Sequence, residues 1–171
     1  PAAVGVAIYP FFSDQSASRD RAALRDTLMR ALRVMILLFV PVSLVLIVLR
    51  EPLVQLAFQR GKFTRDSVAL TVGPFAFYAA GLTVVALEGL LMRFYFAVKN
   101  TVTPALVGAG CVLVHLGVIL AFRESLQNGS MALASTVSKG VKVAVLTGLL
   151  AGVLPGLQGR RNALFLGKML V

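Results

Sequence analysis

Cysteine, histidine, tryptophan and acidic residues are all scarce in this sequence. Its 171 residues include one cysteine, one histidine, no tryptophan and seven acidic residues. The single cysteine, Cys111, has no disulfide partner and no companion thiols for a metal site, and its place in an apolar run predicts a small buried residue. The sequence also has no G-x-S-x-G or Walker pattern. We therefore expect neither an enzyme nor a bound cofactor or metal.

Charge is scarce as well. Charged residues make up 14% of the chain and hydrophobic residues 58%, with a mean hydropathy of +0.87, whereas soluble domains are roughly 25% charged. Apolar runs of about 20 residues cannot be hidden in a soluble domain of this size. The net charge of +10 sits mostly between apolar runs, as in membrane loops, and not on one face of a polar domain. An all-α integral membrane protein is predicted, and nucleic acid binding is not expected.

Four segments are apolar and long enough to cross a bilayer. They cover residues 34–58, 68–98, 104–122 and 131–154. Asp66 suits the N-cap of the second span, Pro104 suits the first turn of the third, and a turn over residues 123–130 is expected before the fourth. Pro41 and Pro52 interrupt the first span, and Pro41 is expected to kink it. Residues 1–12 resemble the end of a further, truncated helix, and they lack the charged region and cleavage site of a signal peptide. We therefore expect the chain to begin inside a longer protein.

The segment before the first full span has a different pattern. In residues 13–33, Leu24, Leu28 and Leu32 recur every fourth residue while arginines cover the other faces. This pattern predicts a cytoplasmic amphipathic helix in the membrane interface. The alternative, a polar extension of the following helix, stays open. Residues 34–158 would then form the four-helix transmembrane part, followed by a basic tail over 159–171.

The distribution of lysine and arginine predicts an orientation. Ten of these residues fall on the side of the amphipathic helix, the 99–104 connection and the tail, and five on the side of the loop at residues 60–63. Because basic residues concentrate in cytoplasmic loops, the first side is predicted to be cytoplasmic and the 60–63 loop to lie outside.

Ionisable residues also lie inside the predicted spans. They are Glu88, His115, Lys139 and Lys142. A charge in hydrocarbon costs roughly 2.5–3.5 kcal/mol on insertion scales, so such residues usually face the bundle interior or a hydrated cavity. Lys139 and Lys142 share one helix face, which Ser135 and Ser138 extend into a polar stripe. Two interpretations stay open for the stripe: a cavity that attracts an anion, or pairing with Glu88 that holds helices together. His115 is interpreted as a helix-packing residue.

Four short stretches follow one another in a distinctive order across residues 1–155. They are Tyr9-Pro10-Phe11-Phe12-Ser13, Leu56-Ala57-Phe58-Gln59-Arg60-Gly61-Lys62-Phe63-Thr64, Tyr78-Ala79-Ala80-Gly81-Leu82, and Arg93-Phe94-Tyr95-Phe96-Ala97 followed by Asn100-Thr101-Val102-Thr103-Pro104. Together they resemble the MurJ (MviN) lipid II flippases of the multidrug/oligosaccharidyl-lipid/polysaccharide exporter superfamily. Two departures stand out. The pair Tyr95-Phe96 reverses the usual aromatic order, and Asn100 replaces the usual Asp, which keeps a capping role but loses the charge.

The resemblance implies a fold and a function. Members have two six-helix lobes around a central cavity and move the undecaprenyl-pyrophosphate-linked peptidoglycan precursor across the bacterial inner membrane by alternating access. This chain would be most of the second lobe, with the missing first lobe, the lipid-linked precursor and membrane lipids as partners. A related exporter of another lipid-linked oligosaccharide or of small cations stays open, as does a membrane scaffold subunit without transport.

Three groups of candidate site residues follow from the polar stripe and the resemblance. The cavity candidates are Lys139, Lys142, Ser135, Ser138 and Glu88; the cytoplasmic-mouth motif is Arg93, Tyr95, Lys99, Asn100, Thr101, Thr103 and Pro104; the outer-loop motif is Arg60, Gly61 and Phe63. For the charged mouth residues, anchoring of helix ends at lipid head groups is the alternative to substrate contact. The family's cationic cavity residues lie largely in parts absent from this chain, so none is carried over.

Overall fold

The computed structural model describes residues 21–60, 63–126 and 128–153, and the regular structure in these ranges is entirely helical. Its helices are α2 (Arg21–Val48), α3 (Arg50–Phe58), α4 (Arg65–Ala97), α5 (Val102–Leu126) and α6 (Asn128–Val153). Four of them, α2, α4, α5 and α6, are long and apolar enough to cross a membrane. The predicted all-α fold with four membrane-length helices is therefore confirmed. The predictions for residues 1–12 and 159–171 lie outside the described residues.

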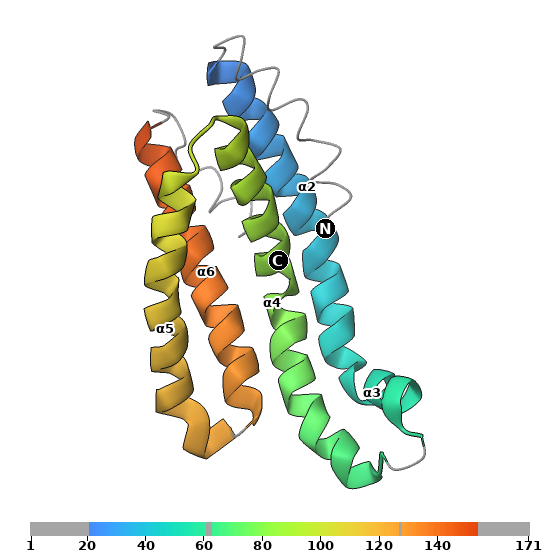
Figure 1. Cartoon of the computed structure of the whole chain (residues 1–171). Helices are drawn as coiled ribbons and strands as arrows, with labels where there is room; N and C mark the ends of the chain where they lie inside the picture. Colours follow the sequence, from blue (N-terminus) through green and yellow to red (C-terminus); the bar gives the residue numbers. More distant parts are fainter. Residues whose placement is uncertain (1–20, 61–62, 127, 154–171) are drawn as a thin grey trace.

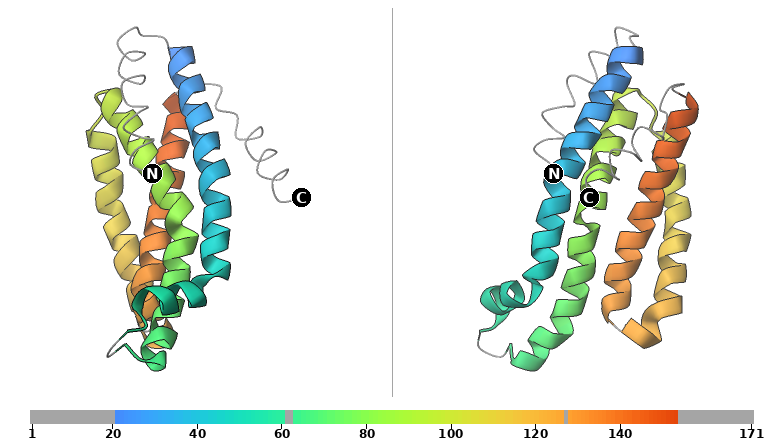
Figure 2. Two further views of the ribbon diagram at one scale, coloured as in Figure 1. Left: turned by 90° about the vertical axis from the view of Figure 1, so that its right-hand side faces the viewer. Right: turned by 180° about the vertical axis from the view of Figure 1, so that it is seen from behind.

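The four long helices run side by side, with α4 and α6 in the middle (Figures 1 and 2). Helix α2 packs against α4, and α5 packs mainly against α6. The core contains Leu28 and Met35 of α2, Leu91 and Phe94 of α4, and Leu146 of α6. Few residues of helix α5 are buried, and many of its large apolar side chains are exposed on the outside of the bundle. Lipid is the natural solvent for such a surface.

The structure corrects the boundary between the predicted amphipathic helix and the first span. Residues 21–33 are the first turns of α2, which continues to Val48 without a break. Leu24 and Leu28 are buried against α4 together with Met35 and Phe39 farther along the same helix. The apolar stripe thus continues with a helical period into the span and packs against α4. This continuity over residues 21–33 favours the polar-extension alternative, while the location of the segment in the membrane interface stays a prediction.

The end of the first span is also corrected. Helix α2 ends at Val48, and a separate nine-residue helix, α3, follows from Arg50. Pro52 explains the break, because it has no N–H for the Val48 carbonyl and its ring collides with that group. Pro41, in contrast, lies inside α2, which continues past it. Helix α3 leaves the direction of α2 and lies at the end of the bundle near the start of α4 (Figure 2).

Two other predicted helix ends shift by a few residues. Asp66 is not the N-cap of α4, because Thr64 occupies that position in an extended conformation. Asp66 instead lies in the first turn, where a negative charge interacts favourably with the helix dipole. The turn predicted over residues 123–130 is shorter than expected, since α5 continues to Leu126 and α6 begins at Asn128.

The connection from α4 to α5 is closed by backbone hydrogen bonds. The N–H of Asn100 donates to the Tyr95 carbonyl at 2.9 Å, and the N–H of Lys99 donates to the Phe96 carbonyl at 3.0 Å. This pair of bonds is a Schellman motif, with Lys99 in the left-handed conformation at φ 60°. Asn100 Oδ1 then accepts the Thr103 N–H at 3.1 Å. The expected capping role of Asn100 is therefore observed, and Pro104 lies in the first turn of α5 as predicted.

Lys99→Gly is expected to stabilise the protein. A residue with a Cβ pays about 1–2 kcal/mol in the left-handed region, and glycine loses roughly 0.5–1 kcal/mol through its freedom in the unfolded chain, so a net gain of about 0.5–1 kcal/mol remains. The free energy of unfolding of the full-length protein in detergent measures it. Lys99→Ala keeps the strain and is the control; equal stability of the Gly and Ala variants would contradict the motif.

Candidate functional site

An open pocket of about 210 Å³, called the cavity below, lies among α4, α5 and α6. Its lining comes from three helices and consists of Glu88, Gly108, Cys111, Val112, His115, Ser138, Lys139 and Lys142. The pocket brings together four of the five predicted cavity residues, because α4 packs directly on α6. The fifth, Ser135, does not line the pocket, and only its backbone carbonyl accepts a hydrogen bond from Ser138 Oγ.

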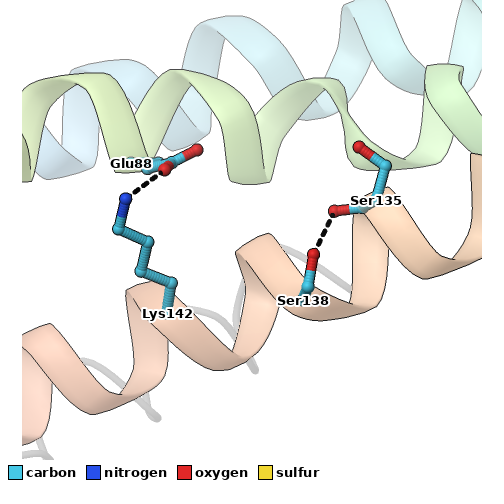
Figure 3. A network of polar contacts seen from close by, with 4 residues as sticks. All are labelled: Glu88, Ser135, Ser138 and Lys142. Atoms are coloured by element: carbon cyan, nitrogen blue, oxygen red, sulfur yellow. Dashed lines mark hydrogen bonds and ion pairs between the residues drawn. The ribbon is translucent and has the colours of Figure 1, made fainter. Parts of the chain in front are cut away.

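An ion pair crosses the cavity from α4 to α6. Lys142 Nζ lies 2.8 Å from Glu88 Oε1, and the two side chains are only 15% and 18% exposed (Figure 3). Gly108 of α5 faces this pair, and a Cβ built there would lie 3.7 Å from Lys142 Nζ. The interpretation that Glu88 pairs with the lysine stripe is therefore observed for Lys142. Removing one partner of a buried ion pair strongly destabilises a protein, because the other charge is then left uncompensated.

The other polar side chains of the cavity form a second short chain of contacts. Ser138 Oγ donates to the Ser135 carbonyl at 3.2 Å, and His115 Nδ1 lies 3.4 Å from Ser138 Oγ. Because the serine hydrogen points at Ser135, we assign the hydrogen of the second contact to His115 Nδ1. His115 thus joins α5 to α6, in agreement with its interpretation as a helix-packing residue.

Lys139 differs from Lys142 in its surroundings. In the described part of the chain, no carboxylate lies within ion-pair distance of its ammonium group. Helix α6 begins at Asn128, so Lys139 lies eleven residues into it, roughly 16 Å deep at about 1.5 Å per residue. That depth exceeds the roughly 12 Å implied by the predicted helix start. The cavity therefore contains two lysines for one carboxylate.

The residues of the cytoplasmic-mouth motif serve different structural roles. Tyr95 is buried, and its hydroxyl donates to the Leu146 carbonyl of α6 at 2.9 Å. Arg93 Nη1 donates to the Gly89 carbonyl of its own helix at 3.1 Å. Lys99 and Thr101 are exposed in the connection that Asn100 caps. The structure thus places Tyr95 in the core between α4 and α6, away from the exposed connection.

Arg60 and Phe63 of the outer-loop motif lie between the end of α3 and the start of α4, and α3 is at the end of the bundle opposite the α4–α5 connection (Figure 1). The Arg60 N–H donates to the Phe58 carbonyl at 2.7 Å, and the Phe63 N–H donates to the Arg60 carbonyl at 3.1 Å. The rings of Phe58 and Phe63 are 6.0 Å apart, and the Arg60 side chain is exposed. Gly61 lies outside the described residues. These bonds and the ring contact connect Phe58, Arg60 and Phe63.

The sequence of this chain is similar to that of one family of known proteins. A family model described as Lipid II flippase MurJ matches residues 2–171. The chain belongs to this family. It is 27% identical over 155 residues to a probable lipid II flippase MurJ of Bdellovibrio bacteriovorus, covering 91% of this chain and 30% of that protein. It is also 37% identical over 103 residues to one of Thermotoga maritima, covering 59% and 21% respectively.

A third relative is the lipid II flippase MurJ of Thermosipho africanus. It is 27% identical over 129 residues, which cover 75% of this chain and 27% of that protein. The chain thus spans less than a third of the length of these MurJ relatives.

One stretch that resembles MurJ has a clear packing role in the structure. In Tyr78–Leu82, Gly81 lies against Thr136 of α6, and the Thr136 hydroxyl donates to the Phe77 carbonyl at 2.9 Å. A side chain at position 81 would occupy the space of the threonine. The glycine of this stretch therefore sets how closely α4 and α6 approach.

The sequence pattern did not identify all the residues that line the pockets. Gly108, Cys111 and Val112 line the cavity from α5, and no polar pattern on that helix marks them. A second pocket, of about 390 Å³, lies between α3 and α4. Its polar residues Glu51, Gln55 and Gln59 recur every fourth residue. Residues with that spacing share one face of a helix, so the sequence could have predicted the part of this pocket that α3 lines.

Proposed function

We propose that this chain is part of a lipid II flippase, a transporter that moves the lipid-linked peptidoglycan precursor across the bacterial inner membrane. The observation that carries the proposal is the family match over residues 2–171, on a chain with four membrane-length helices. The relatives from Bdellovibrio bacteriovorus and Thermosipho africanus are themselves described as a probable lipid II flippase and a lipid II flippase. The missing first lobe, the lipid-linked precursor and surrounding lipids are the partners in this proposal.

The physical task explains why a polar interior is useful. A diphosphate with a sugar–peptide head group cannot cross hydrocarbon unaided, because each bare charge there costs several kcal/mol. Basic groups in a hydrated cavity stabilise phosphate oxygens through charge-assisted hydrogen bonds. The lipid tail can stay in the bilayer, while rocking of the two lobes switches access. Charged groups within spans, such as Lys139, Lys142 and Glu88, cost insertion energy, and this cost argues against a passive scaffold.

A lipid II flipping assay on the full-length protein in vesicles tests the proposal. The wild-type protein is expected to expose labelled lipid II on the far leaflet. Lys139→Gln with Lys142→Gln is expected to slow this about tenfold or more, as removal of a charge-assisted contact of about 1.4 kcal/mol or more implies. Arg123→Gln, which removes an exposed charge at the end of α5, is the matched control.

The outcomes of the assay separate the alternatives. Absence of lipid II movement, with movement of a different lipid-linked oligosaccharide, would favour the related exporter. Absence of any transport by well-folded protein would favour a scaffold. Normal flipping by the folded double variant would dismiss the role of the lysines while leaving the flippase assignment intact.

An orientation accompanies the proposed function. The start of α2, the α4–α5 connection and the end of α6 share one end of the bundle, and α3 lies at the other (Figure 1). We place the first end in the cytoplasm because it holds most of the basic residues. Reporter fusions at residues 60 and 100 are expected to report the periplasm and the cytoplasm respectively. The same compartment for both would contradict the four-crossing arrangement.

A further inference from the structure

The cavity among α4, α5 and α6 has an unbalanced charge. Lys142 is neutralised by Glu88 at 2.8 Å, whereas Lys139 lines the same cavity with no carboxylate within reach in the described part of the chain. With His115 neutral, the lining carries one net positive charge. A lone ammonium group roughly 16 Å along a membrane helix is costly unless water or an anion accompanies it.

The cavity also has the donors and the space for an anion. Lys142 uses one of its three N–H groups on Glu88 and keeps two, and Lys139 has three. The two lysines lie one helical turn apart on the same face. Gly108 contributes no side chain opposite them, so about 210 Å³ stays open, the space of several water molecules at ~30 Å³ each.

We propose that this cavity binds an oxyanion of the phosphate class between Lys139 and Lys142, with Glu88 as a built-in competitor. In the empty cavity the Glu88 carboxylate occupies Lys142. A phosphate oxygen supplies the missing negative charge to Lys139 and shares Lys142 with Glu88. The oxyanion is either a free phosphate or the diphosphate of a lipid-linked substrate, and the second source rests on the proposed flippase function.

The competitor role makes a prediction that a purely structural ion pair does not share. Glu88→Gln keeps the size of the side chain and frees Lys142, so the cavity then carries two uncompensated positive charges. Binding of inorganic pyrophosphate is expected to tighten about tenfold, since one additional charge-assisted hydrogen bond is worth roughly 1.4 kcal/mol or more. Lys139→Gln is expected to weaken binding by a similar factor, and Arg123→Gln to leave it unchanged.

Cys111 provides a reporter because it lines the same cavity. In the full-length protein with every other cysteine replaced by serine, a small water-soluble thiol reagent is expected to modify Cys111. Inorganic phosphate, inorganic pyrophosphate and lipid II are then tested separately as protecting agents. Gly108→Leu fills the cavity without removing a charge and is expected to abolish protection. Gly110→Leu is its control, because Gly110 has nothing within 4 Å.

The outcomes of this experiment test the anion site separately from the proposed flippase function. Protection by phosphate or pyrophosphate supports an oxyanion site open to free anions, and protection by lipid II alone identifies the lipid-linked source. Protection by pyrophosphate in a protein that does not flip lipid II would keep the site and reject the proposed function. Flipping with no protection by any of the three agents would overturn the site and keep the function. A Cys111 that the water-soluble reagent does not reach would also overturn it.

Discussion

Gly81→Ala is expected to lower the free energy of unfolding by roughly 2–4 kcal/mol, the combined cost of overpacking and of one lost hydrogen bond. A Cβ at position 81 would collide with the Thr136 hydroxyl of α6. That hydroxyl donates to the Phe77 carbonyl, so moving it breaks a bond between α4 and α6 as well as their close contact. Unfolding of the full-length protein in detergent, followed by denaturant or heat, measures the loss.

Two further variants separate the contact from a general effect of alanine. Gly73→Ala lies in the same helix with nothing within 4 Å, and it is expected to be neutral or to stabilise by up to about 1 kcal/mol through helix propensity. Thr136→Ala removes the two nearest atoms of the collision, so the double variant with Gly81→Ala is expected to recover most of the loss. Equal stabilities of the Gly73 and Gly81 variants would show that α4 and α6 do not approach this closely.

The contact between Gly81 and Thr136 was only half predictable from the sequence. The pattern Tyr78–Leu82 singled out the glycine but not its partner. Thr136 lies more than 50 residues away, on a helix that the sequence order does not place next to α4. The number and approximate lengths of the long helices were predictable, because an apolar run of about 20 residues has one stable solution in a bilayer.

The boundaries were harder to predict, because they depend on neighbours. Pro41 and Pro52 lie in the same predicted span, yet α2 continues past Pro41 and ends four residues before Pro52. Leu24 and Leu28 form an apolar stripe that suits either the membrane interface or a packed helix. The position of α4 beside α2 explains why these leucines are buried, and the sequence pattern does not contain that position.

The site shows the same limit. Lys139, Lys142, Ser138 and Glu88 stood out because polar groups within spans cost insertion energy. The sequence alone did not say which lysine meets Glu88, because the answer requires α4 to pack on α6 and not on α5, its neighbour in the chain. Gly108 was unrecognisable as a cavity residue, since its contribution is the absence of a side chain opposite Lys142.

The ion pair between Glu88 and Lys142 is expected to produce the second large effect. Glu88→Gln leaves two lysines in a mostly buried cavity without a carboxylate, and the protein is expected to lose about 3 kcal/mol of stability, the lower end of the cost of breaking a buried pair. Lys142→Gln is expected to cost less, because Lys139 lines the same cavity and can neutralise Glu88 in its place.

A double-mutant cycle with Glu88→Gln and Lys142→Gln isolates the pair from its surroundings. Residues in direct contact couple by roughly 0.5–3 kcal/mol, and a coupling above about 1 kcal/mol is expected here because both side chains are less than a fifth exposed. Glu51→Gln is the matched control, since Glu51 accepts a hydrogen bond from Gln55 on the exposed surface of α3. It is expected to change stability by less than about 0.5 kcal/mol.

The order of the single variants is the sharper part of this test. If the pair only clamps α4 to α6, removing either partner leaves one unpaired charge, and the two variants are equally unstable. If Lys139 and Lys142 serve one shared cavity, Glu88→Gln is the less stable of the two, and added inorganic phosphate restores part of its stability by binding the folded state. Equal losses, unaffected by phosphate, would reduce the pair to a clamp and remove the physical reason for a second lysine inside α6.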